Sequence, residues 1–113
     1  MIIPRGAVVL VVLDPTVGHE QRGTRPCIAV SDPAVNADQR FPLIAVVPVT
    51  GTPGDGALYP PLSPGNGLTR ASYALIDHVR SVDKRRIQRV FGRISNAELA
   101  ALDEGLSLFL GLG

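Results

Sequence analysis

The sequence predicts a mainly β domain that ends in one α-helix. Short apolar runs follow one another from residue 7 onward, and Gly, Pro and Asn residues separate them, which is typical of β-strands joined by turns. The helix is predicted by a capping box, Ser95-x-x-Glu98, and by the residues behind it that recur at helical spacing, which are Leu99, Leu102, Leu106 and Phe109. At 113 residues the chain has the size of one domain, spanning residues 1–113.

Three strands are predicted in the N-terminal half. Residues 7–13 are apolar and largely β-branched, which is typical of a buried strand. Residues 27–30 are too apolar to be exposed on both faces and are predicted to be a second core strand. Residues 43–49 form the third strand, which ends at Thr50 and follows a polar connector at 32–42. Consecutive runs of this kind favour neighbouring antiparallel strands.

The C-terminal half is predicted in less detail. Residues 51–69 are rich in Gly and Pro and are expected to form a long loop, with a short edge strand around Leu58 and Tyr59. A strand is expected at 73–79, a short helical turn from Ser81, and a last strand at 90–94. The leucine stripe of the helix is expected to pack on the sheet, and Gly111 to end the helix. Two aromatic residues are expected in the core, Phe91 and Phe109.

Charge and cysteine content narrow the class of protein. The net charge of +1 does not by itself indicate nucleic-acid binding. Six basic residues nevertheless crowd into one segment, which is either a patch that attracts phosphates or a solvated surface: Arg80, Lys84, Arg85, Arg86, Arg89 and Arg93. The single cysteine, Cys27, excludes an internal disulfide, is expected to be a buried inert thiol and favours a cytoplasmic location. The N-terminal apolar run is too short for a membrane span or a signal peptide, so no membrane association is expected.

A candidate site lies where two of the predicted strands meet. Arg25 precedes Pro26, whose ring restricts the backbone and so fixes the direction of the arginine. If Ser31 lies opposite Ile44, antiparallel pairing also places Arg25 opposite Thr50. Directly opposed side chains have Cβ atoms about 4.5 to 5.5 Å apart, close enough for a guanidinium and a hydroxyl to bind one phosphate. A register shift of one residue would separate them, leaving a surface arginine and a strand-ending hydroxyl.

Five segments carry a family resemblance over nearly the whole chain: Arg5-Gly6, Leu13-Asp14-Pro15, Glu20-Gln21-x-Gly23-x-Arg25-Pro26, Val47-Pro48-Val49-Thr50 and Arg80-Ser81-Val82-Asp83-Lys84. In this order they resemble the MazF/PemK family of toxin endoribonucleases. The resemblance implies a compact SH3-like β-barrel with a C-terminal helix. It also implies a homodimer that cleaves single-stranded RNA without a metal ion or other cofactor.

The resemblance also implies catalytic roles for three residues. The family's essential arginine and threonine correspond to Arg25 and Thr50, and an accessory acid corresponds to Glu20. RNA supplies its own nucleophile, the 2′-hydroxyl, so cleavage leaves a 2′,3′-cyclic phosphate and a 5′-hydroxyl. Because guanidinium groups stay protonated, Arg25 is expected to donate hydrogen bonds to the phosphate rather than to transfer a proton. Glu20 is then the candidate base, although it could instead pair with Arg22 or Arg25, and His19 is an alternative base.

Other residues are candidates for holding the RNA, because single strands are bound through stacking and guanidinium contacts: Gln21, Arg22, Tyr59, Arg70 and Arg80. The expected target is mRNA, with tRNA and rRNA as further candidates, so that cleavage inhibits translation and growth. The family also implies a cognate antitoxin, which is expected to cover the site with an acidic, disordered tail.

Two other functions remain open at this stage. Toxins of the same fold bind and poison DNA gyrase without a nuclease site, but such a protein would not need the Arg25 and Thr50 pair. A noncatalytic SH3-like interaction module usually has an aromatic-lined groove, and this chain has only five aromatic residues, 3 Phe and 2 Tyr.

Overall fold

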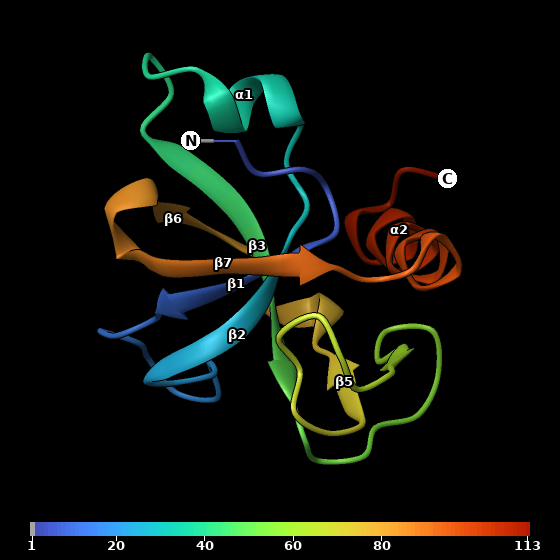
Figure 1. The fold of residues 1–113 in the computed structure, drawn as a ribbon. Coiled ribbons are helices and arrows are strands. Elements are labelled where there is room, and N and C mark those ends of the chain that lie inside the picture. The colour runs from blue at the N-terminus through green and yellow to red at the C-terminus, as the bar shows by residue number, and fades with distance from the viewer. Residues whose placement is uncertain (1) are drawn as a thin grey trace.

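The computed structural model describes residues 2–113, which form one curved antiparallel sheet, a long C-terminal helix and a short helix near the N-terminus (Figure 1). Over these residues the strand order is β4-β5-β3-β2-β1-β7, and β6 also pairs with β3. The strands are β1 (Ala7–Val12), β2 (Thr24–Ala29), β3 (Leu43–Thr50), β4 (Pro61–Leu62), β5 (Ser72–Ala74), β6 (Arg80–Asp83) and β7 (Ile87–Arg93). The helices are α1 (Pro33–Ala37) and α2 (Asn96–Leu110), with single 3-10 turns η1 (Ile76–His78) and η2 (Lys84–Arg86).

Strand β3 organises the sheet because it pairs with three other strands. One edge pairs with β2, and the other edge pairs with β6 along its first half and with β5 at its last two residues. The sheet therefore wraps around β3 and forms a half-barrel. The mainly β fold with a C-terminal helix is confirmed, as is the antiparallel pairing of β2 and β3.

The register of β2 and β3 is the one predicted. Cys27 pairs with Pro48, and the next two residues of β2 pair with Val47 and Val46. Continued by two residues, the same register places Arg25 opposite Thr50. Strand β2 itself begins earlier than expected, at Thr24, so Arg25 lies within the strand, where it pairs with Val11 of β1.

The core lies on both faces of the sheet, as the unbroken apolar run of β1 requires. On one face Val8 and Ile28 pack with Leu102 and Leu106 of α2. On the other face a second cluster fills the half-barrel, and it includes Cys27. The leucine stripe of α2 therefore packs on the sheet, and Phe91 packs partly buried against the first cluster. Phe109 is 45% exposed, contrary to the prediction, because it lies in the last turn of α2 between the exposed Leu108 and Leu110.

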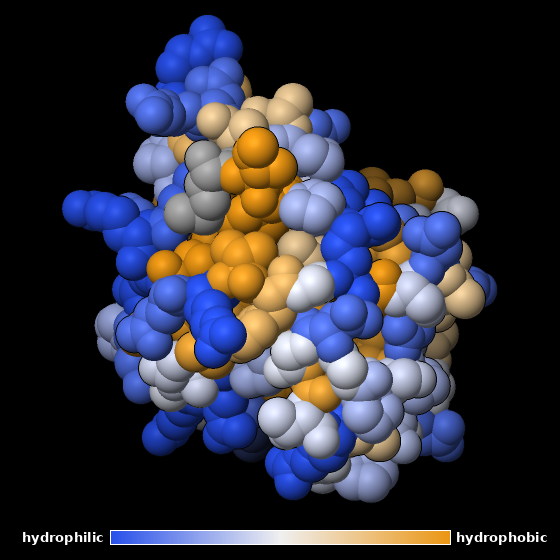
Figure 2. All heavy atoms as spheres, viewed as in Figure 1, coloured by the Kyte–Doolittle hydropathy of each residue, from blue (hydrophilic) through white to orange (hydrophobic). Residues whose placement is uncertain are grey.

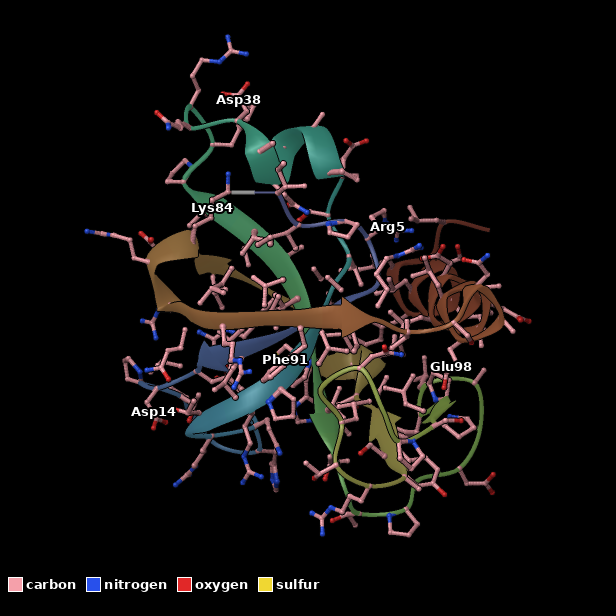
Figure 3. All side chains as sticks on the ribbon, viewed as in Figure 1. Arg5, Asp14, Asp38, Lys84, Phe91 and Glu98 are labelled. Atoms are coloured by element: carbon pink, nitrogen blue, oxygen red, sulfur yellow. The ribbon has the colours of Figure 1, made fainter. Side chains whose placement is uncertain are left out.

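The two ends of α2 have the predicted caps. The hydroxyl of Ser95 accepts a hydrogen bond from the Glu98 N–H, and the Glu98 carboxylate accepts one from the Ser95 N–H. Gly111 ends the helix in the left-handed region, at a φ of 69°. Arg5, labelled in Figure 3, fastens the helix to the sheet, because its guanidinium donates to both carboxylate oxygens of Asp103 and to the Val30 carbonyl.

Five predicted segments differ in the structure. Residues 73–79 do not form one strand, because hydrogen bonds to the Leu58 and Pro48 carbonyls turn the chain after β5 into η1. The segment that begins at Ser81 is part of β6, and the helical turn follows it at Lys84, so the last strand begins at 87 rather than 90. The short edge strand lies at β4, after Leu58 and Tyr59, and the 32–42 connector contains α1.

Large apolar side chains are exposed at several positions of the described chain. Ile2, Val17, Phe41, Leu43 and Val90 are each at least 40% exposed, and so is the end of α2 at Leu108–Leu110 and Leu112. On the face shown in Figure 2, hydrophobic side chains gather in the upper half, below α1, with hydrophilic residues around them. Within residues 2–113, no helix is both long enough and apolar enough to span a membrane.

Candidate functional site

Three adjoining hollows lie along the ends of β2 and β3. We call them the arginine hollow, lined by Arg25, Thr50 and Arg70 among others, the tyrosine hollow, lined by Thr50, Tyr59, Tyr73, Gln21 and His78, and the acid hollow, lined by Glu20, Gln21, Asp77, His78 and Arg80. Thr50 is shared by the first two, and Gln21 and His78 by the last two. The hollows therefore adjoin one another, and together they are called the groove below.

The arginine hollow brings together three of the predicted site residues. Arg25 and Thr50 reach it from the ends of β2 and β3, and Arg70 reaches it from the loop before β5. The Arg70 guanidinium lies over Gly51, since a Cβ atom built there would be 2.3 Å from Nη2. Among the described residues that line this hollow none carries a carboxylate, so its charge is positive. An anion such as a phosphate is the ligand that this charge favours.

Local hydrogen bonds fix the two strand-end residues. The Nε of Arg25 donates to the Arg22 carbonyl at 2.9 Å, which orients the guanidinium and, among the bonds of the described residues, leaves its two terminal nitrogens for another acceptor. The Thr50 hydroxyl accepts a hydrogen bond from the N–H of Thr52 at 3.2 Å. That hydroxyl can still donate its own proton, so both side chains can bind the same phosphate.

The tyrosine hollow occupies the middle of the groove. Its volume is about 340 Å³, which is within the range of small-ligand pockets. Tyr59 packs on Gly54, and its hydroxyl donates to an Asp77 oxygen at 2.9 Å. This hydrogen bond and the charge of Asp77 raise the pKa of Tyr59. Tyr73 of β5 pairs with Thr50 of β3. The rings of Tyr59 and Tyr73, beside the arginine hollow, form a surface on which RNA bases can stack.

Glu20 lies in the acid hollow, where its carboxylate contacts neither Arg22 nor Arg25. One oxygen accepts the Val17 N–H at 3.1 Å, and the other lies 3.7 Å from a terminal nitrogen of Arg80. Arg80 also donates to the Leu13 carbonyl at 3.1 Å. The alternative pairings of Glu20 with Arg22 or Arg25 are therefore not present, and Glu20 lines a different hollow from Arg25 and Thr50.

The other candidate residues are distributed along the groove. Gln21 and Arg80 line the acid hollow, and Tyr59 and Arg70 line the other two. Arg22 is exposed and contributes its carbonyl to Arg25. His19, the alternative base, lines the acid hollow.

Sequence reasoning missed three groove residues, Tyr73, Asp77 and His78. The signal for them was the Asp77-His78 pair that follows directly on an apolar run. Such a polar pair at the end of a strand lies at the rim of the sheet, where a groove can form.

Most of the basic segment points away from the groove. Lys84, which Figure 3 shows reaching toward α1, donates to the Val35 and Asp38 carbonyls at the end of that helix. Arg86 donates to the Val12 and Asp14 carbonyls, and Arg85 forms an ion pair with Asp83. Of this segment, Arg80 alone lines a hollow of the groove in residues 2–113. The patch is largely structural.

Groups that could bind a metal or act as a nucleophile are sparse in the described residues. No three of the His, Cys, Asp and Glu side chains in residues 2–113 are grouped so that they could hold a metal ion. Cys27 is buried, as predicted, and burial raises the pKa of its thiol to about 12. A thiol in this state is unreactive.

Comparison with known proteins identifies relatives over almost the full chain. A family model described as PemK-like, MazF-like toxin of type II toxin-antitoxin system matches residues 4–110. A protein of Mycobacterium tuberculosis named Endoribonuclease MazF9 is 37% identical over 113 residues, which cover 96% of each chain.

Solved structures share the fold. The crystal structure of MazF from Deinococcus radiodurans aligns with a TM-score of 0.82 at 29% identity and covers 98% of each chain. A mycobacterial endoribonuclease solved in complex with its cognate antitoxin aligns with a TM-score of 0.79 at 23% identity, covering 97% of this chain and 96% of that one. The half-barrel with its C-terminal helix is thus an arrangement seen in crystal structures of toxins.

Proposed function

Because the chain belongs to the family of PemK-like, MazF-like toxins of type II toxin-antitoxin systems, we propose that it is an endoribonuclease that cleaves single-stranded RNA. The observation that carries this proposal is the arginine hollow, where Arg25, Thr50 and Arg70 converge. Its positive charge suits the scissile phosphate, and the tyrosine hollow beside it suits an unpaired base.

The proposed reaction needs no metal ion, because the 2′-hydroxyl of the RNA attacks the adjacent phosphorus. The bond to the 5′-oxygen breaks, that oxygen takes up a proton from water, and the products carry a 2′,3′-cyclic phosphate and a 5′-hydroxyl. Arg25 donates hydrogen bonds to the nonbridging oxygens as negative charge accumulates on them, and Thr50 donates one to the same group. Both donors are fixed before the substrate binds, which lowers the cost of reorganisation.

Glu20 is the proposed base that accepts the 2′-proton. It lines the acid hollow, two hollows away from Arg25 along the groove. The 2′-hydroxyl lies next to the scissile phosphate, so this role requires the Glu20 carboxylate to come within hydrogen-bond reach of the arginine hollow when RNA is bound. Gln21, Arg22, Tyr59, Arg70 and Arg80 are proposed to hold the strand along this path.

The proposed partners follow from the family and the surface. A cognate antitoxin with an acidic segment would compete with RNA for the groove, because both would bind Arg25 and Arg70. A homodimer is proposed as well, since exposed apolar side chains such as Leu110 and Leu112 would gain from being covered. We place the protein in the cytoplasm, where its RNA substrate is found.

The test is cleavage of a single-stranded RNA by the purified chain, with and without a chelator. Cleavage that persists in the chelator and leaves 5′-hydroxyl ends is expected. Ends with a 5′-phosphate would show that water attacks instead, and intact RNA together with inhibited gyrase would favour a binding toxin of the same fold.

A further inference from the structure

We propose that His78 is a positioning residue whose neutral imidazole holds the loop of residues 17–22 in the geometry needed for cleavage, and whose protonation releases that loop. The inference rests on the proposed function, because cleavage is one of its readouts. Its structural part can be tested without RNA.

The contact that carries the inference joins the loop to η1. The Gln21 N–H donates a hydrogen bond to Nδ1 of His78 at 3.2 Å, across 57 residues of sequence. In the described part of the chain, every other hydrogen bond of residues 17–22 joins residues at most four apart. The only other long-range polar contact of the loop within residues 2–113 is the ion pair of Glu20 with Arg80 at 3.7 Å, which is longer than a hydrogen bond. Among the described residues, His78 therefore provides the one hydrogen bond between this loop and η1.

Because the Gln21 backbone N–H is the donor, the hydrogen bond fixes the protonation state of the His78 imidazole. A backbone N–H can only donate, so Nδ1 of His78 must carry a lone pair and the ring proton must be on Nε2. A neutral ring is compatible with this bond. Protonation places a hydrogen on Nδ1, two donors then face each other, and the bond to Gln21 is lost.

Several charged groups lie near the His78 imidazole. Asp77 lies on the Nε2 side, with one oxygen 3.8 Å away, while its other oxygen accepts the Tyr59 hydroxyl. Glu20, Arg80 and His19 line the same acid hollow. A protonated ring would thus keep a partner at Asp77 while losing the loop.

Release of the loop would reach the phosphate-binding end of the groove. Gln21 is followed directly by Arg22, whose carbonyl holds Nε of Arg25 at 2.9 Å. Glu20, the proposed base, precedes Gln21. The hydrogen bond between Gln21 and His78 therefore supports both Glu20, which this segment carries, and Arg25, which it orients. Its loss should lower the rate of RNA cleavage rather than the stability of the core.

The experiment measures cleavage of a fluorogenic single-stranded RNA between about pH 5 and pH 8, where histidine changes charge. The variants are H78N, H78A and, as a control outside the groove, R85A. In H78N the amide oxygen takes the position of Nδ1, accepts the Gln21 N–H and does not titrate. In H78A the acceptor is missing at every pH. Arg85 is exposed and lines none of the three hollows.

We expect the unmodified chain and R85A to lose activity in acid by on the order of tenfold, since a small misplacement of reacting groups is costly. H78N should retain most of the neutral-pH rate and lack the decline that follows the titration of His78. H78A should be slow throughout. An acid limb in H78N with the same midpoint as in the unmodified chain, or full activity of H78A, would overturn the proposal.

A second measurement separates this inference from the proposed function. In the protein without RNA, ¹⁵N NMR should show Nδ1 of His78 as the unprotonated nitrogen at neutral pH, and the Gln21 amide should shift with the same midpoint as the ring. If the Gln21 amide does not follow the ring, the inference is wrong even when RNA is cleaved. If it follows the ring and no RNA is cleaved, the proposed function is wrong and the contact stands.

Discussion

Gly105 of α2 lies directly against Ile76, the residue two before His78 in η1. A Cβ atom built on Gly105 would come within 3.0 Å of Ile76 Cγ1 and 2.6 Å of the Ala57 carbonyl oxygen. Both neighbours precede groove residues, since Ala57 leads to Tyr59 and Ile76 leads to His78. The C-terminal helix thus supports the groove from behind through a position where only a glycine fits.

G105A should therefore lower both stability and cleavage. Alanine in a helix gains up to about 1 kcal/mol over glycine, but overpacking costs about 1–3 kcal/mol, and the backbone oxygen of Ala57 cannot rotate away. We expect a net loss in the free energy of unfolding, measured in urea. E104A, at the exposed neighbouring position, should stay within about 0.5 kcal/mol. Equal stability of G105A and the unmodified chain would contradict the close approach.

Cys27 should be unreactive in the folded protein. Its thiol is fully buried in the half-barrel core, and burial raises its pKa to about 12. Ellman's reagent should therefore label the native chain only as fast as it unfolds, and label it at once in denaturant. Rapid labelling of the native chain would mean that the β2 region opens readily.

The parts of the fold that the sequence predicted are those that depend on local pattern. Continuous apolar runs locate β1 and β3, and the Ser95 and Glu98 pair locates the start of α2. The β2 and β3 register was predicted by setting Ser31 opposite Ile44, which places Arg25 opposite Thr50, and the observed pairing of Cys27 with Pro48 agrees with it.

The parts that escaped prediction depend on contacts between distant segments. Helix α1 is anchored by hydrogen bonds of Asn36, a polar residue whose sequence context predicts a loop. The expected strand at 73–79 breaks because Leu75 and Ile76 donate to carbonyls of other segments. For the same reason, no spacing in the sequence shows that Glu20 faces Arg80 or that Gln21 faces His78.

Replacement of Asn36 should lower the free energy of unfolding, although the sequence alone suggests an exposed position. The side chain is 1% exposed and donates to the Ile3 and Ser31 carbonyls at 2.9 and 3.2 Å. N36A would leave these buried acceptors without their donor, at a cost of about 1–3 kcal/mol. Chemical denaturation measures the loss, with Q39A, an exposed neighbour, as the control. A loss as small as that of Q39A would show that water replaces the amide.

Glu98 should make stability depend on pH in the acid range. Burial raises the pKa of its carboxyl, but hydrogen bonds from the Ser63 and Ser95 N–H groups outweigh burial and hold the pKa below the ordinary 4.5. Because the folded-state pKa is the lower one, this contribution is fully present above the ordinary value and is lost as the pH falls through the folded-state pKa. E98Q keeps an acceptor but cannot titrate. The difference in unfolding free energy between the two chains should therefore shrink as the pH falls through that range.

Arg25 should be needed for catalysis and dispensable for folding. It is exposed, and its guanidinium is oriented by a single backbone carbonyl, so R25A should lower kcat/KM for RNA by on the order of 100-fold with little change in Tm. R25K should restore little of the rate, because an ammonium cannot donate two parallel hydrogen bonds to one phosphate. R85A is the matched control, since Arg85 has a side chain 91% exposed and lines none of the three hollows. If R25A cleaves as fast as R85A, the phosphate does not bind in the arginine hollow.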